Sequence, residues 1–565
     1  MQKGATRGGI QTPPCGPSHR MWVAALCFMC LGALCLTIAM LFDKNPVTDE
    51  KDVVIFYSFV GGLVFLAAIS ACSSFVRLRI ASRSLFVPRS WCQMTVSEAL
   101  VLVWYIVFNV VFFTFWWSKV KDGDDPIPRS LGHLNDLNIS LLLFPVARNS
   151  VWSSLFGISF ERAIKFHRWI ARVMFTFITC HMLGWWISWW KKGTFVKEAL
   201  TFNGFFATEY GDWTIPYVEV AWLISLFMVL TSLEYFRRKF FELFYYSHHL
   251  FVVFLIFANF HSWEQWKYLS FSFVLYTLDR VLRFYYSQSA TAVVSASVEG
   301  GSRACAVTRL EMCQHGFSHQ PGQYLFLNIP AISTTQWHPF SVSSCCNQAT
   351  FTCHIKNMGD EQFTGQLYRM VSRNIPIKVN VDGPYGALSL RPDDYDVIIL
   401  VAGGIGITPM ISLAHHCLSS RKCKKLYFIW TIRDPETISL SCFQDFRAVV
   451  SRHPRGAELV DLQIFQTGKL SSTNPHFNAS LGDGLSDADG PERSSIFGHG
   501  TVSHGRPVFR KLFHQLRAAH KRDSQAAGVF TCGPSLMNID VHRACFANST
   551  NQGFKFDFHQ ETFAL

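Results

Sequence analysis

Four histidines lie in two strongly apolar segments of this 565-residue chain. His167 and His181 stand fourteen residues apart in one segment, and His248 and His261 stand thirteen residues apart in the other. In an α-helix these separations correspond to about 21 and 20 Å along the axis, so each helix would carry one imidazole towards either end. Ionisable groups inside a bilayer are costly and usually functional, and neutral imidazole is a common iron ligand. We therefore expect His167 with His248, and His181 with His261, to hold two haem groups between the helices.

The helical phase of the second pair leaves the choice of ligand open. Fourteen residues at about 100° each return within about 40° of the same helix face, but thirteen residues miss it by about 140°. The helix with His248 and His261 must therefore bend, change its pitch locally or hold the two groups at offset positions. His249 is an alternative to His248, and the spacing does not choose between them. A single histidine in such a segment is often a packing residue, whereas two pairs at nearly equal spacing are harder to explain by packing.

Long apolar stretches in the first half of the chain indicate membrane spans. Only 16% of the residues are charged, compared with about 25% in ordinary soluble domains. A helix needs about 20 apolar residues to cross a bilayer. Basic residues follow every second stretch, which favours both termini in the cytosol and disfavours nucleic-acid binding despite the net charge of +12. The eight expected spans are residues 21–41, 53–76, 97–117, 137–153, 163–189, 216–235, 243–260 and 264–286.

Short strand-like runs replace these stretches after residue 290. Residues 291–390 are compatible with a small β-barrel, which contains the motifs His338-Pro339-Phe340-Ser341 and His354-Ile355-Lys356. Strands that alternate with helix-like segments after residue 390 indicate a doubly wound α/β domain. The polar residues 468–505 are expected to form a surface loop within this half.

A glycine-rich turn follows the buried strand expected at residues 397–401. Glycines between a strand and a helix let the backbone approach a pyrophosphate at the helix N-terminus, although a simple tight turn is an alternative. A second strand ends at Arg433, whose guanidinium is suited to the 2′-phosphate of NADPH, and a third leads into Cys532. The turn contains Gly403, Gly404 and Gly406, followed by Thr408 and Pro409.

The motifs HPFS, DGPYG, AGGIGITP and CGP, in this order behind a membrane region with paired histidines, resemble those of the ferric reductase and NADPH oxidase superfamily. The resemblance covers about residues 97–565. It implies that His338–Ser341 contact the flavin, that His354–Lys356 lie near the FAD phosphates, and that His248 is preferred over His249. It also implies that Cys532 lies near the nicotinamide and that Phe563 covers the flavin, so these two are the expected catalytic residues. The other residues implied to bind NADPH are Gly403, Gly404, Gly406, Thr408, Pro409, Arg433 and Arg506.

Together these features predict a multidomain protein. A polytopic α-helical membrane domain with bis-histidine haem sites is followed by a β-barrel FAD-binding domain and an α/β NADPH-binding domain. The expected boundaries are 1–20 for a cytosolic tail, 21–96 for two extra spans and a basic loop, 97–286 for the haem domain, 287–390 for the barrel, and 391–565 for the NADPH-binding domain.

The resemblance implies a transmembrane oxidoreductase that uses NADPH, FAD and two haem b groups, with its nucleotide domains in the cytosol beneath the plasma membrane or an endomembrane. Ferric chelates are the preferred acceptor, because residues 142–148 and 165–167 and the two extra spans resemble plant-type ferric-chelate reductases. Lys191, Lys192 and Lys197 either attract anionic chelates or form a solvated loop. Superoxide formation from O2 is the alternative, and the sequence shows no EF-hand loop of the calcium-gated oxidases. A metal or proton transporter is a remote alternative, because it leaves the nucleotide motifs without a role.

Overall fold

The computed structural model describes residues 51–72, 96–148, 158, 160–200, 214–468, 494–496 and 500–561, apart from residues 263, 288, 301–305, 347, 387, 389, 421, 523 and 550–552. The chain forms two compact units. The first comprises Met1–Leu78, Leu100–Phe144 and His167–Val274, and the second comprises Arg79–Ala99, Pro145–Phe166 and Leu275–Leu565.

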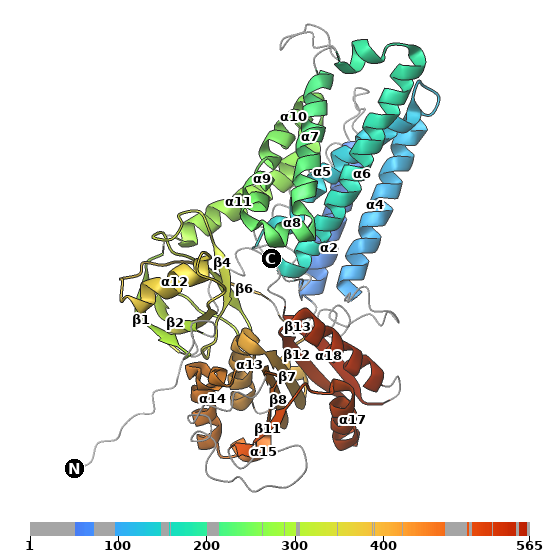
Figure 1. The fold of residues 1–565 in the computed structure, drawn as a ribbon. Coiled ribbons are helices and arrows are strands. Elements are labelled where there is room, and N and C mark those ends of the chain that lie inside the picture. The colour runs from blue at the N-terminus through green and yellow to red at the C-terminus, as the bar shows by residue number, and fades with distance from the viewer. Residues whose placement is uncertain are drawn as a thin grey trace, which may run out of the picture. The chain divides into compact units, whose positions relative to one another are not determined.

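Helices make up the first unit, and several of them continue into the second. Figure 1 shows α4, α5, α6 and α7 running lengthwise in one bundle. Their apolar composition explains their formation, because the backbone polar groups of a chain in lipid must be satisfied within the segment. The helices are α2 (Lys51–Cys72), α4 (Val96–Val120), α5 (Pro126–Leu142), α6 (Phe160–Lys192), α7 (Thr214–Ser232), α8 (Glu234–Lys239), α9 (Phe241–His248), α10 (Phe251–His261) and α11 (Gln265–Ser287).

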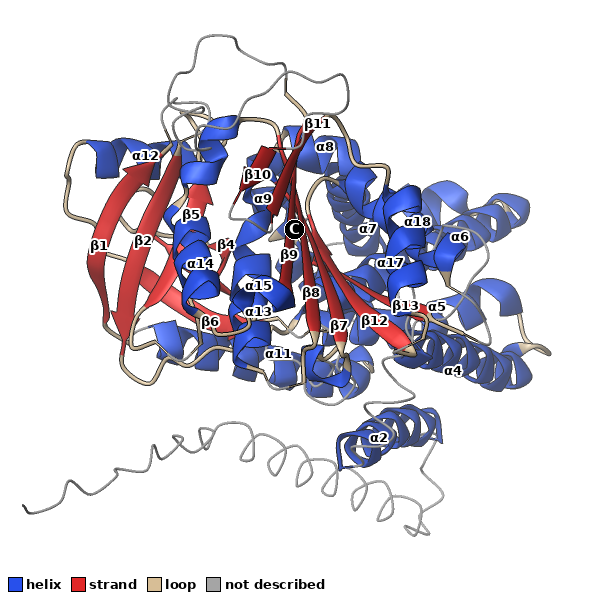
Figure 2. Cartoon of the chain, turned by 90° about the horizontal axis from the view of Figure 1, so that it is seen from below, coloured by secondary structure: helices blue, strands red, loops and turns tan. Residues whose placement is uncertain are grey.

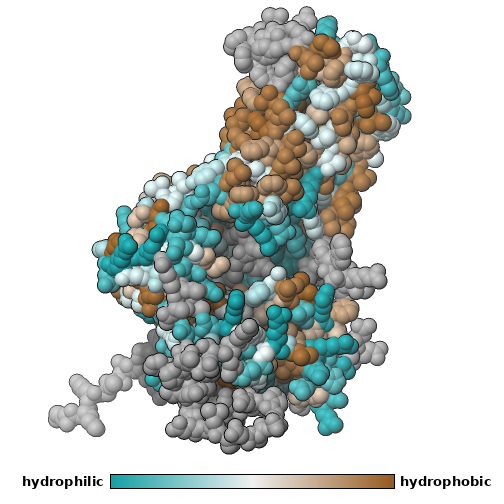
Figure 3. Space-filling model, viewed as in Figure 1, coloured by the Kyte–Doolittle hydropathy of each residue, from teal (hydrophilic) through white to brown (hydrophobic). Residues whose placement is uncertain are grey.

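The outer surfaces of these helices are apolar. Figure 3 shows hydrophobic residues gathered over them. On α7, Val220, Leu223, Phe227 and Leu230 are exposed at helical spacing, which is the pattern of a lipid-facing stripe. Among the described residues, three helical stretches are long and apolar enough to cross a membrane. They are Glu98–Val120, Phe160–Lys192 and Phe241–His261, and Asp52–Gly62 and Val218–Ser232 are shorter apolar stretches.

Helices occupy six of the eight expected spans, and the expected span at 21–41 lies outside the described residues. The fourth expected span, 137–153, is misplaced. The helix there, α5, begins at Pro126 and ends at Leu142, before Pro145. Hydropathy missed residues 126–136 because the buried positions of this part of α5 include Ser130, Asn135 and Asp136.

Two antiparallel sheets form the barrel region of the second unit. One has the order β1-β2-β5 and the other the order β4-β3-β6, with Leu310, Leu325, Val342 and Cys353 among the apolar residues of their common core. The strands are β1 (Thr291–Glu299), β2 (Val307–Gln314), β3 (Tyr324–Asn328), β4 (His338–Ser341), β5 (Phe351–Lys356) and β6 (Asn380–Tyr385), with helix α12 at Phe363–Ser372.

A seven-stranded sheet with the order β10-β11-β9-β8-β7-β12-β13 forms the rest of the unit, and this confirms the predicted α/β fold. All strands are parallel except β10. Figure 2 shows helices on both faces of the sheet. The strands are β7 (Val397–Gly403), β8 (Lys425–Ile432), β9 (Val460–Gln466), β10 (Ser494–Ile496), β11 (Gly500–His504), β12 (Ala526–Cys532) and β13 (Lys555–Glu561), and the helices are α13 (Ile407–Ser419), α14 (Ser441–Arg452), α15 (Gly456–Leu459), α17 (Phe509–His520) and α18 (Ser535–Asn548).

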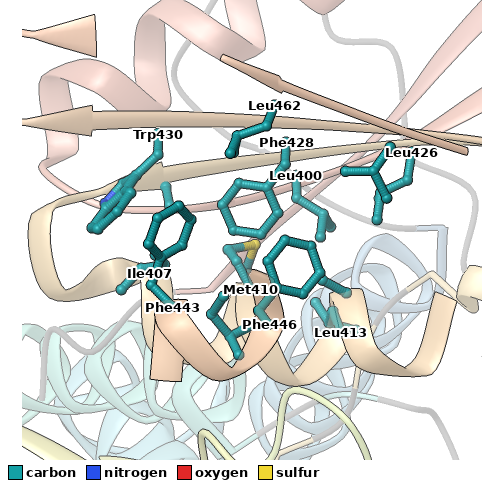
Figure 4. Close-up of a cluster of buried hydrophobic side chains, with 14 of the residues drawn as sticks. Leu400, Ile407, Met410, Leu413, Leu426, Phe428, Trp430, Phe443, Phe446 and Leu462 are labelled. Carbon is teal, nitrogen blue, oxygen red and sulfur yellow. The ribbon is translucent and has the colours of Figure 1, made fainter. Parts of the chain in front are cut away.

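Two apolar cores hold these helices against the sheet. On one face Trp430 and Phe428 pack against Phe443 and Phe446 of α14 and against α13 (Figure 4). On the other face Phe513 of α17 packs with β12 and β13 residues. Residues 500–504, at the end of the expected loop 468–505, form β11, which pairs with β9 and extends the sheet; residues 469–493 lie outside the described residues. The short, polar sequence of β11 carries little strand signal by itself.

Candidate functional site

The two histidines of each pair face each other between helices of the first unit. The ring centres of His167 and His248 are 6.1 Å apart, and those of His181 and His261 are 6.2 Å apart, with an interplanar angle of 72° in each pair. Two imidazoles that bind one metal ion from opposite sides, at about 2 Å per bond, place their ring centres about 6 Å apart. Both pairs therefore have the separation that a shared iron atom requires.

Backbone carbonyls orient one histidine of each pair. The His167 Nδ1 atom lies 3.0 Å from the Leu142 carbonyl oxygen, and the His181 Nδ1 atom lies 2.6 Å from the Pro128 carbonyl oxygen. These contacts place the ring proton on Nδ1, so Nε2 is the nitrogen available for a metal. Gly132 of α5 makes room for His181, because a Cβ atom there would lie 2.7 Å from His181 Cε1.

A local change of helical pitch brings His248 and His261 towards their partners. Between α9 and α10 the Leu250 amide donates to the Ser247 carbonyl, and the Val252 amide donates to the His249 carbonyl. These i→i+3 bonds wind the chain more tightly than an α-helix and so reduce the 140° mismatch of thirteen residues. His249 is exposed, and its Nδ1 lies 2.8 Å from the Tyr245 carbonyl. The geometry therefore supports His248 as the ligand of the inner pair.

The glycine-rich turn lies where the strand order of the α/β sheet reverses. β7 and β12 are adjacent and parallel, while the chain continues to β8 on one side and to β13 on the other. Open α/β sheets bind ligands at this point, outside the carboxyl ends of the strands. The turn after β7 and the Cys532-Gly533-Pro534 turn after β12 therefore meet at the expected nucleotide site.

The two turns pack backbone against backbone. A Cβ atom at Gly403 would lie 2.6 Å from Pro534 Cδ, and one at Gly533 would lie 3.0 Å from the Gly403 Cα atom. Gly406 likewise leaves no room for a side chain against the Cys532 carbonyl. Thr408 and Pro409 lie in the first turn of α13, next to the amide groups that favour an anion. Burial raises the pKa of the Cys532 thiol well above its ordinary value, so this residue stays a neutral thiol.

The two arginines expected to bind NADPH lie at the same edge of the sheet. Arg433 follows β8 and is exposed, and Arg506 follows β11 and is exposed. β9 lies between β8 and β11 in the sheet. Backbone hydrogen bonds link the C-terminal end of β9 to the C-terminal ends of both neighbouring strands. The Thr467 amide donates to the Ile432 carbonyl, and the Gly505 amide donates to the Gln466 carbonyl.

The residues expected to bind FAD fall into two groups. His338, Pro339 and Phe340 are partly exposed on β4, and the His338 ring stacks on Phe363 at the start of α12 with ring centres 4.2 Å apart. Ser341 and Ile355 are buried, and Lys356 is partly exposed. The expected residue Phe563 lies outside the described residues.

His354 is buried between hydroxyl groups rather than open to a phosphate. Its Nδ1 lies 2.8 Å from Ser343 Oγ, and its Nε2 lies 3.0 Å from Ser441 Oγ at the start of α14. Burial lowers its pKa to about 4, so the ring is neutral. The structure therefore places His354 between the barrel and the α/β domain, and its expected position near the FAD phosphates stays a prediction.

Sequence reasoning missed the N-terminus of α12, which begins at Phe363, the residue on which the His338 ring stacks. There the Thr364 hydroxyl accepts from the Met358 amide at 3.0 Å, and Gly365 approaches the Gly359 carbonyl so closely that no side chain fits. Such a helix start is suited to a pyrophosphate. The signal was the glycine at 359 followed by Thr364-Gly365 soon after the HIK motif.

Comparisons with known proteins match all three parts of the chain. Residues 131–259 match the family model described as "Ferric reductase like transmembrane component", residues 304–389 match "FAD-binding domain", and residues 395–546 match "Ferric reductase NAD binding domain".

Similar proteins include both oxidases and ferric reductases. NADPH oxidase 1 of Mus musculus is 25% identical, with 84% of this chain and 95% of that protein covered. One superoxide-generating NADPH oxidase heavy chain of Dictyostelium discoideum is 29% identical, with 83% and 97% covered. Probable ferric reduction oxidase 1 of Arabidopsis thaliana is 30% identical, with 61% and 52% covered.

The order of the three matched domains is the order expected from the motifs. The transmembrane match includes His167, His181 and His248 and ends at residue 259, just before His261. The nucleotide match includes both turns at the strand-order reversal. The chain is an integral membrane oxidoreductase with FAD-binding and NAD(P)-binding domains, and it belongs to the ferric reductase and NADPH oxidase superfamily.

Proposed function

We propose that this oxidoreductase moves electrons from cytosolic NADPH, through FAD and two haem b groups, to ferric chelates on the other side of the membrane. The observation that carries the proposal is the presence of two histidine pairs, at ring separations of 6.1 and 6.2 Å, between α6 and the consecutive helices α9 and α10. The reaction balances as one NADPH and two Fe(III) giving one NADP+, one proton and two Fe(II).

The residues of the α/β domain are suited to bind and orient NADPH. The glycine turn at 403–406 and the first turn of α13 present backbone amides to the pyrophosphate, and Arg433 and Arg506 present guanidinium groups to the 2′-phosphate. Cys532, at the end of the adjacent strand, lies beside the glycine turn and is placed to flank the nicotinamide.

The barrel and the histidine pairs supply the remaining positions. His338, Pro339 and Phe340 on β4 offer a partly exposed surface for the flavin ring. When bound, FAD converts the two-electron hydride of NADPH into single electrons, which haem carries one at a time. Each histidine pair would hold the iron of one haem with both of its imidazoles, and a haem held in this way supplies electron transfer rather than substrate binding.

Several features support ferric chelates as the acceptor. The segments at 142–148 and 165–167 resemble plant-type ferric-chelate reductases, and relatives of that kind reach 32% identity. Among the lysines expected to attract chelates, Lys191 and Lys197 are exposed, but Lys192 is paired with Asp125 at 2.8 Å and does not offer a free charge. The positive-inside pattern supports nucleotide domains in the cytosol.

Superoxide formation from O2 is the second candidate function. It is favoured by the length of the similarity, because the oxidase relatives match 83% and 84% of this chain and almost their whole length, whereas the plant reductase matches 61%. The electron-carrying residues are common to both functions, so the acceptor has to be measured.

An assay with superoxide dismutase separates the two functions. Membrane vesicles with the nucleotide domains outside receive NADPH, and the reduction of a ferric chelate trapped inside is followed with and without internal dismutase. Direct iron reduction is insensitive to dismutase and consumes one NADPH per two Fe(II). Loss of Fe(II) formation in the presence of dismutase would show that superoxide is the product and would refute ferric-chelate reduction.

A further inference from the structure

A buried cluster of four charged residues lies in the unit that contains the barrel. Asp382 of β6 is its centre, with its Oδ2 atom 3.0 Å from Arg148 Nη1 and 2.9 Å from Arg283 Nε. Asp279 completes the cluster, because its Oδ2 atom accepts from the Arg148 amide at 3.4 Å and lies 4.0 Å from Arg283 Nη1. Two arginines and two aspartates balance in charge, and the side chains of Asp382 and Asp279 are each only 3% exposed.

Aromatic residues of the barrel enclose this cluster. The guanidinium carbon of Arg148 lies 3.2 Å from the centre of the Phe326 ring, which is a cation–π arrangement. The Tyr385 hydroxyl donates to Asp382. Burial and the nearby Glu161 carboxylate at the start of α6 raise the pKa of the Tyr324 hydroxyl well above its ordinary value. The contacts of the cluster are thus directional hydrogen bonds and a cation–π contact, which fix the relative position of the groups more strictly than an apolar contact would.

The partners of the barrel in this cluster lie on segments that continue the helices of the chain, and two of these segments flank His167 of the inner pair in the sequence. Arg148 follows α5, whose Leu142 carbonyl orients His167. Glu161 stands six residues before His167 on the continuous helix α6, which corresponds to about 9 Å along its axis. Arg283 lies in the last turns of α11, just before the barrel begins at β1.

We propose that Asp382, Arg148 and Arg283 are positioning residues that hold the FAD-binding barrel on these segments and thereby set the rate of electron transfer from FAD to the inner haem. The inference rests on the proposed electron path and is independent of the final acceptor. A buried ion pair is costly unless every partner is in place, so the cluster favours one arrangement over displaced ones. Electron transfer slows as donor and acceptor move apart, so a displaced barrel would slow haem reduction without slowing the reduction of FAD by NADPH.

The test uses the full-length, haem-loaded protein and three substitutions, Asp382→Asn, Arg148→Gln and Arg148→Lys. Glu311→Gln is the matched control, because it breaks an ion pair of the same barrel, Arg309–Glu311 at 2.9 Å, that is more exposed. Anaerobic single-turnover mixing with NADPH follows the absorbance of FAD and of haem separately. Hydrogen exchange without NADPH reports on the order of residues 145–148 and 279–287.

We expect Asp382→Asn and Arg148→Gln to keep both haems and to reduce FAD within twofold of the unmodified rate, while haem reduction slows at least tenfold. Residues 145–148 and 279–287 should exchange faster in both variants, Arg148→Lys should recover part of the haem rate, and Glu311→Gln should change neither rate. Haem reduction at the unmodified rate, or equal slowing of both steps, would overturn the positioning role. Failure of NADPH to reduce haem in the unmodified protein would instead overturn the proposed function itself.

Discussion

Substitution of Gly132 by alanine tests the geometry of the outer histidine pair. The new Cβ atom would lie 2.7 Å from His181 Cε1, which is at least about 0.8 Å shorter than a favourable carbon–carbon contact. The ring can move only by lengthening its hydrogen bond to the Pro128 carbonyl and by leaving its place opposite His261. Alanine itself is favourable in a helix, so α5 should stay intact and the effect should remain local.

The expected loss follows from the usual cost of overpacking, about 1–3 kcal/mol. At about 1.4 kcal/mol per factor of ten, haem affinity at the outer site should fall by a factor of roughly 5 to 150. The measurement is the haem-to-protein ratio of the purified protein, together with titration of haem into the depleted protein. The ratio should decrease from about two towards about one, with the inner site retained.

Gly62→Ala is the matched control, because it also places alanine in an apolar helix but meets no atom within 4 Å. It should leave the haem content unchanged. If Gly132→Ala bound two haems with unmodified affinity and spectrum, the assignment of His181 as an axial ligand would be refuted.

Three further substitutions test the other sites. His181→Leu should leave one haem per chain and abolish acceptor reduction while NADPH still reduces FAD; acceptor reduction that persists would exclude an essential outer haem. Arg433→Ala should raise the KM for NADPH about 10- to 100-fold and leave the KM for NADH nearly unchanged, because a hydrogen bond to a charged group contributes about 1.5–3 kcal/mol. Equal changes of the two KM values would argue against recognition of the 2′-phosphate. His354→Gln should flatten the pH dependence of the free energy of unfolding of the full-length protein. In the unmodified protein burial lowers the folded-state pKa of His354 to about 4, below its ordinary 6.5, so the unfolded chain takes up the proton first as the pH falls. About 2 kcal/mol of stability is therefore lost between pH 7 and pH 5. An unchanged pH profile in this variant would show that another group titrates.

Local patterns were sufficient to predict much of the fold and of the site. The histidines stood out because an ionisable residue in an apolar helix has few explanations, and their spacing on two helices gave the pairing that the ring distances support. The glycine turn was recognisable because it directly follows a buried strand, and the parallel pairing of β7 with β12 explains why Cys532 lies beside it.

Features that depend on distant contacts were not accessible from the sequence. Arg148 and Asp382 are 234 positions apart, and nothing near either residue indicates the other. The contact of His354 with Ser441 joins residues 87 positions apart, so nothing around the HIK motif indicated it. The start of α5 was missed because its buried face is polar, which a hydropathy window counts as loop.

The tight winding between α9 and α10 makes the His248–His261 segment sensitive to its length and tolerant of its composition. The i→i+3 bonds after His248 already compensate for part of the angular offset of thirteen residues. One inserted or deleted residue would turn His261 by about 100° around the helix axis, away from His181. Related chains that keep both haems should therefore exchange one apolar side chain for another in this segment while conserving the number of residues between the two histidines.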